Sequence, residues 1–481
     1  MIGDSLPEYV FIRLSILGLR LIAPLSIIYC AYSGYHHHFL YSRWLGAYAV
    51  AEAAFYLLVF LPRSRLLQKA AGHPPLPTRE QREALFAKCF ARVRDSSMAS
   101  GWFFAPPDGI KRDNLVEWLV WAIFGTHREH IRDEWVEELQ GYVDKMEGLL
   151  GRKIEEGWDQ TVRCMKVTLD PVDMVHRPLL WYFIVAIIDT ITALQMKSKG
   201  FHHFSSANCA SCFPPRTFTA FSNKAPHPDL VYWLRPHRSA TKDPILFLHG
   251  IGIGLWPYVP FFGDLVEADP DVGIIAVENL SISMRISQPP LSRGEMLEAI
   301  TELLDAHNIP RIVVVAHSYG TVIAAHMLRD PDLCPRVSAW LLVDPIPFLL
   351  HLPSVAYNFV YRPPRTANEW QLWYFASRDP DIARALARHF FWAENILWKE
   401  DLEGKEVAVV LCGKDQIVDA AEVRRYLTGE EDSDIKFRWE KDGLEVLYYP
   451  DLDHSKVFDT KDLRRPLVEI LDRFGRRSQR L

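Results

Sequence analysis

The chain has 481 residues and a formal net charge of −6, with 54 Lys and Arg against 60 Asp and Glu. Its composition, 49% hydrophobic and 24% charged, is that of a globular protein and excludes a disordered one. Because there is no basic excess, we expect no nucleic-acid partner. Seven cysteines in so long a chain exclude a disulfide scaffold.

Two apolar stretches near the N-terminus predict a helical hairpin. Residues 10–32 contain two arginines, and residues 44–62 contain Glu52 as their single charge. Each stretch is about as long as the ~20 helical residues that cross a hydrocarbon core. We therefore expect residues 1–70 to form a membrane-anchor hairpin; the alternative is a pair of apolar helices packed on a soluble domain.

Basic residues follow the second stretch, namely Arg63, Arg65 and Lys69. Positive charge beside a membrane helix marks its cytosolic end. We therefore expect a membrane location, with the remainder of the chain facing the cytosol.

Residues 71–226 predict a helical extension that ends in a linker. Apolar residues recur at helical spacing in residues 79–94, 114–124 and 134–150. Residues 179–196 are apolar apart from Asp189 and two threonines. Three interpretations of this segment stay open: a third membrane element, a buried helix and a lipid-facing cap.

Residues 201–226 are rich in Ser, Pro, Asn and Cys and predict the linker itself. Cys209 and Cys212 form a Cys-x-x-Cys pair there, but a second well-spaced pair of zinc ligands is missing, so we expect no metal.

From residue 229 onward, short apolar runs rich in β-branched residues alternate with helical stretches. This alternation predicts an α/β fold with a doubly wound, mostly parallel sheet whose strands are covered on both faces. In such sheets the chemistry lies beyond the carboxyl ends of the strands. The predicted strands are residues 230–234, 244–248, 272–277, 311–316, 339–343, 407–411 and 444–449.

Ser318 follows the run 311–316 and precedes a helical stretch. Small residues stand two positions before it, at Ala316, and two positions after it, at Gly320. This is the pattern of a nucleophile elbow, a sharp turn that projects the serine Oγ. The alternative is a serine that only caps the following helix.

A glycine-rich loop, His249-Gly250-Ile251-Gly252, follows the run 244–248. Its glycines allow backbone N–H groups to approach an oxyanion, and we expect the Ile251 and Tyr319 N–H groups to be the donors. We expect His249 to support the loop by hydrogen bonding. Glycines that merely close a turn are the alternative.

A serine hydroxyl becomes nucleophilic when a histidine takes its proton and a carboxylate orients that histidine. Asp415 follows the run 407–411, and His454 follows the run 444–449. Asp344, which follows the run 339–343, is a rival for the acid and could instead support the sheet edge. Asp415 is favoured because the acid must lie beside the histidine loop.

The motifs HGIG, AHSYG and GKD and the final histidine stand in the order found in the α/β-hydrolase fold, which residues 229–481 resemble. The resemblance implies a core of residues 227–345 and 406–481. Ala316 departs from the glycine of many members, but its side chain is small. With GIGIGLWPYVPF and SMRISQP, the N-terminal region is similar to uncharacterised fungal α/β-hydrolase-like membrane proteins. The roles that the resemblance implies are nucleophile for Ser318, general base for His454, orienting acid for Asp415 and oxyanion hole for the Ile251 and Tyr319 N–H groups.

Residues 346–405 are too many for a simple crossover and predict a cap or lid over the active site. Aromatic side chains there would line an apolar pocket; the alternative is that they only pack the cap onto the sheet. The aromatic residues are Phe348, Tyr357, Phe359, Tyr361, Trp370, Trp373, Tyr374, Phe375, Phe390, Phe391, Trp392 and Trp398.

Together these features predict a membrane-associated serine hydrolase of the esterase or lipase kind. It would cleave an ester, thioester or amide of a lipophilic small molecule or lipid through an acyl-enzyme, with no metal or organic cofactor. Two alternatives stay open: an acyltransferase that uses the same triad, and a non-catalytic binding or scaffold protein that keeps the fold.

Overall fold

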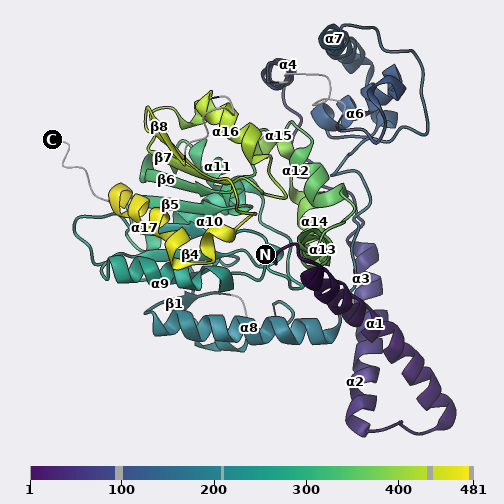
Figure 1. The fold of residues 1–481 in the computed structure, drawn as a ribbon, viewed down its shortest axis with the longest axis vertical. Helices are drawn as coiled ribbons and strands as arrows, with labels where there is room; N and C mark the ends of the chain where they lie inside the picture. Colours follow the sequence, from purple (N-terminus) through teal and green to yellow (C-terminus); the bar gives the residue numbers. More distant parts are fainter. Residues whose placement is uncertain (1, 93–100, 207–210, 431–436, 476–481) are drawn as a thin grey trace.

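The structure, a computed structural model, describes residues 2–92, 101–206, 211–430 and 437–475 (Figure 1). Its centre is a nine-stranded sheet with the strand order β1-β2-β4-β3-β5-β6-β7-β9-β8. The strands from β4 to β9 in this order pair in parallel, and β1, β2 and β8 are antiparallel to their neighbours. The strands are β1 (His202–Phe204), β2 (Val231–Arg235), β3 (Ile245–Leu248), β4 (Ile274–Glu278), β5 (Ile312–His317), β6 (Val337–Val343), β7 (Val407–Cys412), β8 (Arg438–Lys441) and β9 (Leu444–Tyr449).

Helices cover both faces of this sheet, as the α/β pattern predicts. Alternate residues of β5 enter different apolar clusters: Val314 packs toward α10, α11 and α16, and Val315 packs toward α8, α9 and α17. Both faces are therefore dry, which explains the continuous apolar runs. These helices are α8 (Leu179–Ser198), α9 (Val259–Ala268), α10 (Arg293–Ala306), α11 (Gly320–Leu328), α16 (Ala420–Thr428) and α17 (Lys461–Gly475).

All seven predicted strands are present, and the predicted α/β-hydrolase architecture is confirmed. The expectation that residues 201–226 are only a linker is wrong, because β1 lies in this segment and pairs with β2. A three-residue strand is too short to show an alternating pattern. Cys209 of the predicted Cys-x-x-Cys pair lies outside the described residues.

The N-terminal hairpin projects from the body at the lower right of Figure 1. It consists of α1 (Leu6–His36), α2 (Arg43–Ala54), the π-helical turn η1 (Phe55–Phe60) and α3 (Leu61–Leu66). Within the described ranges, three segments are long and apolar enough to cross a membrane: Leu6–His36, Arg43–Leu66 and Leu179–Ser198. The first part of α1 is tied to the body, because Ile12 and Ile16 pack against the cap residue Tyr374.

The extension and the cap lie together on one side of the sheet (Figure 1). The extension contributes an apolar cluster of its own, built on α6 and α7, against which the cap residues Tyr357 and Trp392 pack. Its helices are α4 (Arg79–Phe90), α6 (Arg112–Phe124) and α7 (Asp133–Leu150), and those of the cap are α12 (Ser354–Ala356), α13 (Ala367–Leu372), α14 (Pro380–His389) and α15 (Trp392–Asn395).

Candidate active site

Ser318 occupies a strained turn between β5 and α11. Its φ is +50°, in the left-handed region that residues with a side chain rarely adopt. Its N–H donates to the Val343 carbonyl oxygen at 3.0 Å, which fixes the turn to β6. A Cβ at Gly320 would collide with the Leu248 carbonyl oxygen, so only glycine fits two positions after the serine. This is the geometry of a nucleophile elbow, with the positive end of the α11 dipole behind the serine.

His454 links Ser318 to Asp415. The His454 Nε2 atom lies 2.9 Å from the Ser318 Oγ atom, and the His454 Nδ1 atom lies 2.6 Å from the Asp415 Oδ2 atom. All three side chains are buried. The three residues predicted from separate strands therefore meet within hydrogen-bond distance, in the arrangement by which a histidine takes the proton of a serine hydroxyl.

The Asp415 carboxylate determines the charge state of His454. Burial disfavours the imidazolium, but the Asp415 charge and hydrogen bond outweigh it, and the pKa of His454 rises to about 9. The carboxylate thus stabilises the imidazolium that forms once the histidine has accepted a proton.

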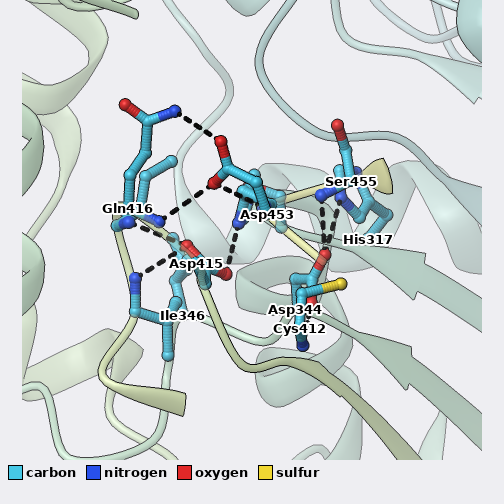
Figure 2. A network of polar contacts seen from close by, with 12 residues as sticks. His317, Asp344, Ile346, Cys412, Asp415, Gln416, Asp453 and Ser455 are labelled. Carbon is cyan, nitrogen blue, oxygen red and sulfur yellow. Dashed lines mark hydrogen bonds and ion pairs between the residues drawn. The ribbon is translucent and has the colours of Figure 1, made fainter. Parts of the chain in front are cut away.

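The loops that carry Asp415 and His454 are tied to each other (Figure 2). The Asp415 Oδ1 atom accepts the N–H groups of Ile417 and Val418, so Oδ2 alone faces the histidine. Asp453 accepts the His454 N–H at 2.7 Å and the Gln416 N–H at 3.2 Å. The role of Asp453 was not predicted; its place directly before His454 was the available signal.

Asp344, the rival acid, fastens the histidine loop and does not contact the imidazole. Its two oxygens accept the Cys412 N–H at 3.0 Å and the Ser455 N–H at 2.8 Å. Burial raises its pKa to about 6. His317 lies 3.8 Å from it, and burial, helped by the nearby His454, holds the pKa of His317 well below its usual range. Figure 2 shows this second carboxylate beside the Ser455 end of the loop.

The glycine-rich loop lies directly against the serine. A Cβ at Gly250 would stand 2.8 Å from the Ser318 Cβ atom. His249 braces the loop, because its Nδ1 lies 2.7 Å from the Gly250 carbonyl oxygen and its Nε2 accepts the Asn279 N–H at 2.9 Å. The Gly252 N–H donates to the Ile282 carbonyl oxygen at 3.1 Å.

The two expected oxyanion donors stay available. Within the described part of the chain, the N–H groups of Ile251 and Tyr319 donate to no acceptor. Tyr319 directly follows the serine in the turn between β5 and α11, and Ile251 belongs to the glycine-rich loop that lies against the serine. Free donors at this place suit an oxygen that becomes negative during acyl transfer.

A cavity of about 480 Å³ opens beside Ser318. Its wall comes from three parts of the chain: the core at Ile251 and Ile417, the cap at Leu386, and the extension at Trp121. The wall is mostly apolar, as expected of a pocket for a lipophilic ligand.

The aromatic residues of the cap have divided roles. Four of the twelve line the cavity, namely Phe359, Phe390, Phe391 and Trp392. A second set packs against the N-terminal helix and α8, namely Trp370, Trp373, Tyr374 and Phe375. The sequence did not predict that the extension contributes to the cavity. The apolar residues of the extension recur at the spacing of any buried helix face, and this spacing does not distinguish a cavity wall from a packed core.

Asp344, Asp415 and His454 also offer ligand atoms within 4.8 Å of one another, close enough for one cation. However, His454 Nδ1 already pairs with Asp415, and both Asp344 oxygens accept backbone N–H groups. The donor set is therefore engaged in the arrangement described above and fits a metal poorly.

Residues 245–460 match the sequence model of the Alpha/beta hydrolase family. A pig (Sus scrofa) protein named 1-acylglycerol-3-phosphate O-acyltransferase ABHD5 is 30% identical over 116 residues, which are 23% of this chain and 31% of that protein. The chain therefore spans less than a third of that relative's length.

Solved structures with a similar backbone fold include three hydrolases. A bacterial membrane phospholipase A is 14% identical and covers 62% of this chain and 94% of its own, with a TM-score of 0.39. A carboxylesterase of Nitrososphaera gargenis is 14% identical, covering 51% and 95%, with a TM-score of 0.36. The proline iminopeptidase of Mycobacterium smegmatis is 12% identical, covering 52% and 97%, with a TM-score of 0.35.

Proposed function

Because residues 245–460 belong to the alpha/beta hydrolase family, we propose that the chain is a membrane-associated serine hydrolase that cleaves an ester, thioester or amide of a lipophilic substrate. The observation that carries the proposal is the hydrogen-bonded series Ser318, His454 and Asp415 beside an apolar cavity. We place the catalytic part on the cytosolic side, on the basis of the positive charges that follow the hairpin.

The reaction begins when the Ser318 Oγ atom attacks the substrate carbonyl carbon while its proton passes to His454 Nε2. The carbonyl oxygen becomes negative and accepts the N–H groups of Ile251 and Tyr319. His454 then gives the proton to the departing alcohol, thiol or amine, and the acyl group stays on the serine. Water attacks next, with His454 taking its proton. His454 then gives this proton to the departing Ser318 Oγ atom, so that the acid and the free serine are released.

The charges around the cavity favour an uncharged substrate. Among the described residues of the wall, Arg82 is the permanent cation, and its guanidinium donates to the Glu138 carboxylate and to the Pro77 carbonyl oxygen. Burial lowers the pKa of His73, which also lines the wall, and so keeps it neutral. A phosphate-bearing substrate would find no free cation among the wall residues that the structure describes, whereas a neutral acyl ester needs none.

Acyl transfer is the second candidate, because the printed name of the pig relative is that of an acyltransferase. An acyltransferase would deliver the acyl group from Ser318 to a second alcohol before water reaches it. A long-chain acyl thioester as donor, with 1-acylglycerol 3-phosphate as acceptor, tests this outcome directly.

The test uses the full-length protein in detergent micelles, with monoacylglycerols of increasing chain length. We expect the wild type to release free fatty acid and Ser318→Ala to release none. In a parallel assay with added 1-acylglycerol 3-phosphate, transfer of the acyl group to this acceptor without free acid would replace hydrolysis by acyl transfer. Equal inactivity of the wild type and Ser318→Ala, with both proteins folded by circular dichroism, would favour a non-catalytic binding protein.

A further inference from the structure

The helix α8 has two apolar faces, of which only one is covered by protein. Trp181, Val185 and Met196 are buried against the body. The opposite face is exposed over the length of the helix; its phenylalanine, at position 183, is 62% exposed, and its last leucine, at position 194, is 64% exposed. We call this exposed face the α8 stripe; it consists of Leu180, Phe183, Ile184, Ile187, Ile191 and Leu194.

Buried charges lock α8 to the folded body. Asp189, in the middle of the helix, forms ion pairs with Arg216 at 2.9 Å and with Arg285 at 3.3 Å. Arg216 also binds Glu278 at the end of β4, at 2.7 Å. A helix that crossed a membrane would expose Asp189 to lipid and leave Arg216 without this partner, both of which are costly. Although α8 is long enough to span, its place on the sheet excludes it from doing so.

The first turn of α8 is joined to the hairpin. The Leu179 N–H donates to the Glu52 Oε2 atom of α2 at 2.8 Å, and Glu52 is fully buried. Trp181 packs with Leu19 of α1 and Phe55 of η1. Figure 1 shows α8 running from this junction along the lower edge of the body, on the side to which the hairpin projects. The N-terminal end of the α8 stripe therefore lies next to the hairpin.

We infer that α8 lies in the plane of the membrane surface and buries its stripe among the acyl chains of one leaflet. A lipid leaflet is the occupant that fits, because the stripe carries no charged residue and adjoins two candidate membrane helices. Lys197 follows the stripe at the exposed end of the helix, where lipid phosphates would lie. This inference concerns how the body rests on the membrane and does not depend on the proposed chemistry.

Depth-dependent quenching tests the inference on the full chain in phosphatidylcholine vesicles. A genetically encoded fluorescent amino acid replaces Phe183 or Leu194 in turn, which leaves the native cysteines in place. Quenching is compared between lipids with a nitroxide near the carbonyl end and lipids with one near the methyl end of the acyl chain. Ile28 in the hairpin, 63% exposed, serves as the inserted reference, and Phe437 on the far edge of the sheet, 49% exposed, as the reference outside the membrane.

In an in-plane helix the two labels lie at one depth, although they are about 16 Å apart along the axis. We expect the same quenching ratio at positions 183 and 194, with the shallow nitroxide stronger, and no quenching at position 437. A shift from shallow to deep between the two positions would show a spanning helix and overturn the inference. Quenching at position 28 without quenching at 183 and 194 would also overturn it, since the stripe would then face water or another protein.

Discussion

Asp415→Asn and Asp344→Asn form a matched pair that separates the two buried carboxylates. In Asp415 the Oδ1 atom accepts two backbone N–H groups, so an asparagine must keep its oxygen there and turn its NH₂ group to His454 Nδ1. That NH₂ group donates to Nδ1 and leaves the imidazole proton on Nε2. The histidine then presents a donor to Ser318 and cannot accept its proton.

The expected loss of kcat for Asp415→Asn is about 10⁴-fold, the size known for a triad histidine held in the wrong tautomer, and corresponds to ~5.5 kcal/mol of transition-state stabilisation. Asp344→Asn replaces one acceptor of a buried backbone N–H by a donor and should destabilise the fold by about 1–3 kcal/mol. Its kcat per folded molecule should fall less than about tenfold, because Asp344 does not touch the imidazole.

The assay is kcat with a short soluble ester, normalised to the folded fraction from thermal unfolding. Both proteins must fold at the assay temperature for the comparison to count. A 10⁴-fold loss in Asp344→Asn together with near-normal turnover in Asp415→Asn would refute the assignment of the acid.

Three further outcomes follow from the site. Because Asp415 raises the pKa of His454 to about 9 against burial, and the base must be neutral to act, kcat/KM should rise about tenfold per pH unit up to that pH; a plateau already at pH 7 would contradict this. Gly320→Ala should lower the free energy of unfolding by at least about 1–3 kcal/mol, because its Cβ meets backbone, whereas Gly294→Ala at an open site of α10 should be neutral or slightly stabilising in the same denaturant titration. Leu386→Trp should fill part of the cavity and reduce turnover of long-chain esters more than of short ones; an unchanged chain-length profile would show that the acyl chain lies elsewhere.

The three residues of the hydrogen-bonded series could be predicted because each follows a strand whose apolar run is visible in the chain. Parallel strands bring their carboxyl ends to one edge, so Asp415 and His454 meet although they lie 39 positions apart in the sequence. The sequence favoured Asp415 over Asp344 as the acid but could not decide between them. Both residues follow a strand, and only the loop geometry determines which carboxylate faces the imidazole.

Features that depend on contacts between distant segments left no local signal. β1 is too short for a pattern, and the wall residue Trp121 has the spacing of any buried helix face. Glu52, the single charge of the second apolar stretch, accepts the Leu179 N–H in the first turn of α8, a contact that the local sequence does not indicate. The domain boundaries drawn from composition stay a prediction.

Covalent labelling tests the central claim most directly. The full-length protein in detergent is treated with a fluorophosphonate, and intact-mass and peptide analysis locate the adduct. We expect one adduct, on Ser318, that is absent in Ser318→Ala and strongly reduced in His454→Ala. A folded protein that takes up no probe, or that carries it on another residue, would contradict the claim that Ser318 is an activated nucleophile.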